Sequence, residues 1–132
     1  MLLPAPYWLS YPEMAALAGA EVKLIPTQAE GGFQLDINAL EAAITPRSRL
    51  LVLNTPGNPT GRVMPRQELE AVAEMVRRHP QLLVMSDEIY EFLLAQGEQH
   101  HSFAAIAPDL ADRCFTVLSL IHISEPTRRE GI

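Results

Sequence analysis

The sequence predicts an α/β fold: a partial, mostly parallel β-sheet with flanking helices. Two short apolar runs, residues 50–53 and 82–85, are each bounded by polar or turn residues, as buried parallel strands are. Between them, residues 65–79 repeat apolar side chains at helical spacing. Strand, helix and strand in this order form a βαβ unit, so we expect two parallel strands joined by a helix.

Before this unit the sequence predicts two short helices and a strand. Pro12 suits the first position of a helix over residues 13–18. Residues 21–25 alternate between polar and apolar and predict a strand. Asp36 is a favourable N-cap for a helix that extends to residue 44. We therefore expect a helix, a strand and a second helix before the βαβ unit.

After the βαβ unit, the spacing of apolar residues gives a weaker indication of helices and strands. Residues 96–102 are polar and predict a loop, and residues 108–111 predict a helical turn. Residues 115–119 form a third apolar run, which predicts the next strand of the sheet.

Composition limits the classes of function. The chain has 132 residues, enough for one domain, and a formal net charge of -6 with no basic stripe, which argues against a nucleic-acid surface. Its apolar runs are too short to span a membrane, and its first residues lack the pattern of a signal peptide. Cys114 is the only cysteine, so no internal disulfide can form. These observations favour a cytoplasmic protein.

Polar residues follow both central strands. Residues 54–61 read Asn-Thr-Pro-Gly-Asn-Pro-Thr-Gly, and residues 86–90 read Ser-Asp-Glu-Ile-Tyr. In open α/β sheets, ligands bind beyond the carboxyl ends of the strands. We therefore expect the chemistry of the protein at these two segments.

The same segments carry a family resemblance. N-x-P-x-N-P-T-G followed by S-D-E-I-Y resembles the large domain of class I/II aminotransferases, which depend on pyridoxal 5′-phosphate (PLP). Residues 6–8, Pro-Tyr-Trp, are similar to an upstream segment of that family. The resemblance runs from about residue 4 to residue 120. It implies that residues 1–120 are a partial PLP-binding large domain, a middle part of a full family member.

The resemblance assigns roles to five residues. Asp87 matches the carboxylate that keeps the pyridine nitrogen protonated. Asn58 and Tyr90 match the residues that hydrogen-bond the ring oxygen O3′, and Asn58 also matches a residue that holds the substrate carboxylate. Trp8 matches the aromatic residue that stacks on the ring beside the substrate. Ser119 matches a serine that binds the phosphate.

Four of these residues also have a structural explanation, which for Trp8 is packing near the start of the chain. Asp87 could cap a turn, Asn58 could shape a loop, and Tyr90 could be a core aromatic with a bonded hydroxyl. The motifs taken together favour the cofactor interpretation, whereas for Trp8 both interpretations stay open. Glu88 is expected on the opposite side of its strand from Asp87, with a structural role.

The last residues depart from the family pattern. Ile121 and His122 stand where the resemblance implies Ser-Lys, and we interpret residues 121–132 as an aberrant or disordered tail. The only lysine, Lys23, lies in the strand over residues 21–25 and matches no catalytic position. With the Schiff-base lysine absent, no catalytic residue is assigned, and we expect the chain as given to be inactive. His100 and His101 lack further ligands at metal-binding spacing, so no metal site is expected.

The resemblance implies amino-group transfer between an amino acid and a 2-oxo acid by a parent that is a homodimer. Two alternatives remain: a PLP-dependent lyase or synthase of the same fold, and the effector domain of a PLP-binding transcription regulator. The DNA sequence beyond the codon for Leu120 would discriminate between them, because it would show whether Ser-Lys and a downstream arginine follow.

Overall fold

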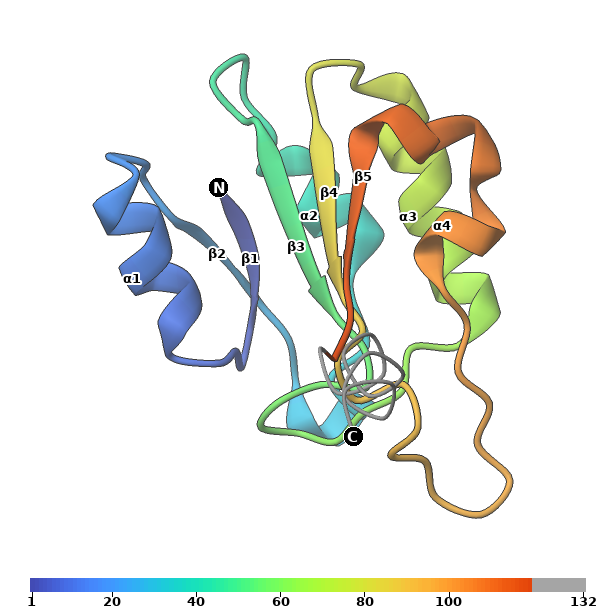
Figure 1. The fold of residues 1–132 in the computed structure, drawn as a ribbon. Helices are drawn as coiled ribbons and strands as arrows, with labels where there is room; N and C mark the ends of the chain where they lie inside the picture. The colour runs from blue at the N-terminus through green and yellow to red at the C-terminus, as the bar shows by residue number, and fades with distance from the viewer. Residues whose placement is uncertain (120–132) are drawn as a thin grey trace, which may run out of the picture.

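The computed structural model describes residues 1–119, which form a five-stranded sheet in the order β2-β1-β3-β4-β5 (Figure 1). Every neighbouring pair of strands is parallel. The strands are β1 (Leu2–Ala5), β2 (Lys23–Pro26), β3 (Leu50–Asn54), β4 (Leu83–Asp87) and β5 (Cys114–Val117). The helices are α1 (Ser10–Leu17), α2 (Ile37–Ala42), α3 (Arg66–Arg78) and α4 (Phe103–Ile106), with 3₁₀ turns at Ala29–Gly31 and Pro108–Arg113.

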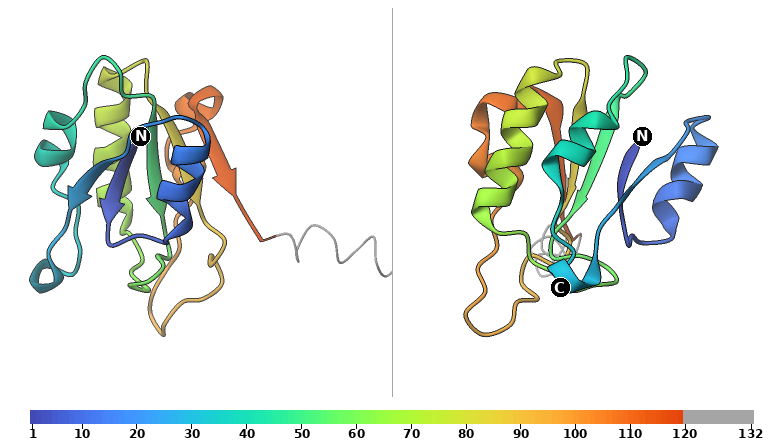
Figure 2. Two further views of the ribbon diagram at one scale, coloured as in Figure 1. Left: turned by 90° about the vertical axis from the view of Figure 1, so that its left-hand side faces the viewer. Right: turned by 180° about the vertical axis from the view of Figure 1, so that it is seen from behind.

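Helices cover both faces of the sheet, but unequally. On one face, Leu51 and Val84 pack with buried residues of α2, α3 and α4, among them Leu40, Val72 and Phe103, in the main core. The view from behind shows α2 and α3 over this face (Figure 2). On the other face, Leu3, Val52 and Tyr11 of α1 form a smaller core, so alternate residues of a strand serve opposite cores.

The predicted βαβ unit is confirmed. β3 and β4 lie side by side in register, so that Leu50 opposes Leu83 and Asn54 opposes Asp87. The predicted N-cap is also confirmed, since the Asp36 side chain accepts from the Ala39 N–H at 3.0 Å. The sheet is thus parallel throughout the described residues, as the fold class requires.

Two elements were not expected from the sequence. β1 has only four residues, and Pro4 lies within it. α4 has a single turn, too short to show a helical period.

Helix α1 begins at Ser10, so Pro12 lies inside the first turn instead of opening the helix. This position is tolerated because the first N–H groups of a helix have no partner within it.

Other expectations need smaller corrections. The strand expected over residues 115–119 begins one residue earlier and ends at Val117. Cys114 is half-buried, and burial raises the pKa of its thiol.

No helix in residues 1–119 is long and apolar enough to cross a membrane. The predicted tail, residues 121–132, lies outside the described residues.

Candidate functional site

A hollow of about 300 Å³ lies at the carboxyl ends of β3 and β4. It is lined by Trp8, Tyr11, Asn54, Asn58, Asp87, Ile89 and Tyr90. The structure therefore brings together Trp8, Asn58, Asp87 and Tyr90, the residues that the sequence predicted to face one ligand. The fifth predicted residue, Ser119, follows β5 and is not among those that line this hollow within the described chain.

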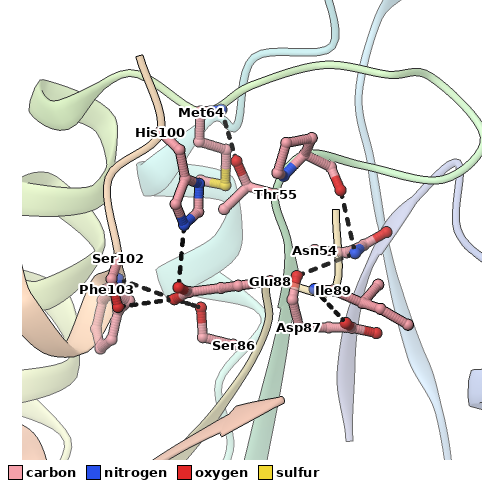
Figure 3. A network of polar contacts seen from close by, with 11 residues as sticks. Asn54, Thr55, Met64, Ser86, Asp87, Glu88, Ile89, His100, Ser102 and Phe103 are labelled. Atoms are coloured by element: carbon pink, nitrogen blue, oxygen red, sulfur yellow. Dashed lines mark hydrogen bonds and ion pairs between the residues drawn. The ribbon is translucent and has the colours of Figure 1, made fainter. Parts of the chain in front are cut away.

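The register of β3 and β4 creates this arrangement. Asn54 and Asp87 are opposite each other at the strand ends. The backbone carbonyl of Asp87 accepts from the Thr55 N–H and from the Asn54 side-chain amide, both at 3.1 Å (Figure 3). The Asn54 Oδ1 in turn accepts from the Asn58 N–H at 2.7 Å. Asn54 thus connects the loop that carries Asn58 to the strand that carries Asp87.

The Asp87 carboxylate is held from two sides. It is 7% exposed, its Oδ2 accepts from the Tyr11 hydroxyl at 2.6 Å, and its Oδ1 accepts from the Ile89 N–H at 3.3 Å. Burial, followed by the hydrogen bond to Asp87, raises the pKa of Tyr11 above its ordinary value. Tyr11 therefore keeps its proton and remains a hydrogen-bond donor to Asp87.

Trp8 forms an aromatic wall of the hollow. Its ring lies 5.5 Å from that of Tyr11 at an interplanar angle of 89°, an edge-to-face contact. Trp8 is 43% exposed, so part of its ring remains open to a ligand. Trp8 and Tyr11 therefore both border the hollow, and Tyr11 also holds Asp87.

Tyr11 is the site residue that the sequence analysis missed. The available signal was its spacing, three residues after Trp8 and on an otherwise mostly exposed short helix. The sequence analysis gave Asn54 no role of its own, because its bond to Asp87 depends on strand register, which no local pattern shows.

Lys23 lies at the opposite end of the sheet from the hollow. It pairs with Leu2 at the start of β2, whereas the hollow forms where the parallel strands end. Its side chain is exposed. Lys23 therefore lies on a solvent-exposed part of β2.

The fold is therefore that of an α/β chain with a hollow at the tips of its parallel strands. The sequence model of the family described as "Aminotransferase class I and II" matches residues 1–120. The chain belongs to this family.

Individual relatives agree. The chain is 53% identical over 117 residues to the bifunctional aspartate aminotransferase and glutamate/aspartate-prephenate aminotransferase of Petunia hybrida, covering 89% of this chain and 24% of that protein. It is 45% identical over 116 residues to the aspartate/prephenate aminotransferase of Cereibacter sphaeroides, covering 88% of this chain and 29% of that protein.

Solved structures give the same result. The aspartate aminotransferase of Rhizobium meliloti superposes with a TM-score of 0.87 at 34% identity, covering 91% of this chain and 30% of that one. The Thermus thermophilus enzyme with maleate superposes with a TM-score of 0.81 at 44% identity, covering 89% and 29%. The chain thus spans less than a third of the length of these relatives.

Proposed function

We propose that this chain is part of the PLP-binding large domain of an aminotransferase, and that the hollow receives the pyridine ring of the cofactor. The observation that carries the proposal is the convergence of an acid, an amide, a phenol and an aromatic ring, from Asp87, Asn58, Tyr90 and Trp8, on one hollow. They were predicted from separate motifs. Asn58, Asp87 and Tyr90 meet because β3 and β4 are adjacent and in register, and Trp8 reaches the same hollow from the segment between β1 and α1.

The residues present fit this cofactor. PLP, when bound, supplies a protonated pyridine ring that withdraws electrons from the substrate carbon. Asp87 is the group that would favour the protonated ring nitrogen, because a nearby carboxylate stabilises a cation. Tyr11 and the Ile89 N–H hold that carboxylate in place. Asn58 and Tyr90 would donate to the ring oxygen, and Trp8 would stack on the ring.

Ser119 as a phosphate ligand stays a prediction from the resemblance, as does a Schiff-base lysine in the parent protein. Asn58 and Trp8 would also contact the substrate. The cytoplasmic location and the homodimeric parent likewise stay predictions.

We infer that the substrates are an amino acid and a 2-oxo acid. The relatives are named for aspartate, glutamate and prephenate, and one solved relative carries maleate, a dicarboxylate. These names favour aspartate as the amino donor. They also favour amino transfer over the lyase, synthase and regulator alternatives, for which the residues of the hollow would serve equally well.

The proposal is tested through Trp8, the only tryptophan of the sequence, whose fluorescence reports on the hollow. The ligand is 4′-deoxypyridoxine 5′-phosphate, which keeps the ring and phosphate of PLP but has no aldehyde to react with Lys23. We expect saturable quenching of Trp8 that Asp87→Ala greatly weakens and Lys23→Ala leaves unchanged. Quenching that is equal in Asp87→Ala and the unaltered chain would contradict the proposal.

A further inference from the structure

Two neighbouring carboxylates leave the tip of β4 on opposite sides. Asp87 lines the hollow, whereas Glu88 is directed into the interior on the side of α4 and is 1% exposed. The proposed cofactor chemistry does not use Glu88. A buried carboxylate is costly unless its oxygens are satisfied, so its partners indicate what it does.

Glu88 accepts four hydrogen bonds (Figure 3). Its Oε1 accepts from the Ser86 hydroxyl at 2.8 Å, the Ser102 hydroxyl at 3.1 Å and the Phe103 N–H at 3.1 Å. Its Oε2 contacts the His100 Nε2 at 3.1 Å. Three of these partners come from residues 100–103, twelve or more positions along the chain, so the carboxylate fastens that segment to the tip of β4.

The surroundings of His100 determine which ring nitrogen carries its hydrogen. Nε2 faces a carboxylate oxygen, which can only accept, so Nε2 must donate. Nδ1 is buried, and nothing in residues 1–119 hydrogen-bonds to it. A hydrogen on Nδ1 would be a buried donor without an acceptor, so these contacts place a hydrogen on Nε2 and favour none on Nδ1.

The backbone around Glu88 is fixed on both sides as well. The Glu88 N–H donates to the Val117 carbonyl at 2.9 Å, and the preceding carbonyl, that of Asp87, accepts from Thr55 and Asn54. Beyond Glu88 the chain turns, and Tyr90 reaches the hollow two residues later. Two side chains therefore anchor this turn: Asp87 on the side of the hollow, through the Ile89 N–H, and Glu88 on the side of α4.

We propose that Glu88 is a positioning residue: its buried carboxylate, bonded to Ser86, His100, Ser102 and Phe103, holds the tip of β4 so that Asp87 and Tyr90 face the hollow together. Its effect on a ligand rests on the proposed function of the hollow, whereas its effect on the position of Asp87 and Tyr90 does not.

The first test compares Glu88→Gln and Glu88→Ala with the unaltered chain by NMR. Glutamine keeps the shape of the side chain but replaces one acceptor oxygen with an NH₂ donor, which now faces His100 or the three donors at Oε1. We expect the ring ¹⁵N shifts of His100 to change from the Nε2–H pattern. We also expect the amide resonances of Ile89 and Tyr90 to move in both variants.

The second test measures ligand binding by Trp8 quenching with 4′-deoxypyridoxine 5′-phosphate. We expect both Glu88 variants to bind roughly ten-fold more weakly, the scale on which loss of an outer hydrogen-bonding partner weakens metal sites. Val72→Ala is the control for general loss of stability, because Val72 is buried in α3, away from the β4 tip. It should leave affinity and the Ile89 and Tyr90 resonances unchanged.

The outcomes separate the possibilities. If Glu88→Gln behaves like the unaltered chain in the Ile89 and Tyr90 resonances, Glu88 only fills space and the inference is wrong. If those resonances move as expected but the unaltered chain does not bind the ligand, Glu88 positions the strand tip and the proposed function of the hollow is wrong instead. If the Ile89 and Tyr90 amide resonances move as far in Val72→Ala as they do in Glu88→Gln, the change is a general loss of stability and the inference is overturned.

Discussion

The hydrogen bond between Tyr11 and Asp87 should contribute measurably to stability. It is 2.6 Å long, it joins α1 to β4, and Tyr11 and Asp87 are 2% and 7% exposed. Tyr11→Phe removes the hydroxyl but keeps the ring that contacts Trp8. Hydrogen bonds to charged groups contribute about 1.5–3 kcal/mol, so we expect the free energy of unfolding to fall by about 2 kcal/mol.

Urea unfolding followed by Trp8 fluorescence measures this change. With a slope of about 2 kcal/mol per molar urea, the midpoint should fall by roughly 1 M. Asp87→Asn and the double variant complete a thermodynamic cycle, and the coupling between the two sites should account for most of the loss. A loss in Tyr11→Phe below about 0.5 kcal/mol would refute the reasoning, because the bond would then be no stronger than a weak neutral one.

The same bond makes stability depend on alkaline pH. The pKa of Tyr11 is higher in the folded chain than in the unfolded chain, first because of burial and then because of Asp87. Above pH 10 the unfolded chain releases a proton that the folded chain keeps. The contribution of Tyr11 is therefore complete below about pH 10, and it falls as pH rises further by up to about 1.4 kcal/mol per unit. Tyr11→Phe should lose this dependence, and an equal decline in both proteins would contradict the assignment.

Three further predictions concern other parts of the chain. Hydrogen bonds from Arg78, and to a smaller extent from His79, lower the pKa of Glu41 to about 2. The contribution of Glu41 to stability should therefore be complete above the ordinary pKa of a glutamate and be lost as the pH falls toward 2. Acid unfolding of Glu41→Gln should show a shallower decline than that of the unaltered chain. Asp36→Ala removes the cap on the Ala39 N–H and should lower stability by about 1 kcal/mol in urea unfolding, whereas Asp36→Ser should restore most of it. Adding PLP should produce no lysine-dependent absorbance band, and a band that disappears in Lys23→Ala would show that Lys23 can reach the cofactor.

The sequence was sufficient where local patterns are strong. β3, α3 and β4 were predicted because two buried apolar runs flank a helix of 13 residues, whose periodicity is clear. Asn58, Asp87 and Tyr90 were predicted from two motifs that follow these strands, and Trp8 from the upstream segment over residues 6–8. Their meeting point follows from a general rule, that parallel strands end at the same edge of a sheet.

What could not be predicted depends on contacts between distant segments. β1 is a strand only because it pairs with β2 and β3, and four residues with a proline give no strand pattern of their own. Tyr11 reaches Asp87 across 76 positions of the chain, and His100 reaches Glu88 only because α4 folds back onto β4. The sequence indicated a structural role for Glu88, but not that its four partners hold the tip of the strand.

The most direct test of the central claim is an NMR titration of the chain with 4′-deoxypyridoxine 5′-phosphate. We predict that the Trp8 indole, the Asn58 side-chain amide and the Ile89 backbone amide shift together with one saturation curve, because all three residues line the hollow. The Lys23 amide, at the other end of the sheet, should stay in place. Saturable shifts centred on Lys23, or none at Trp8, Asn58 and Ile89, would contradict the claim that this hollow binds the cofactor ring.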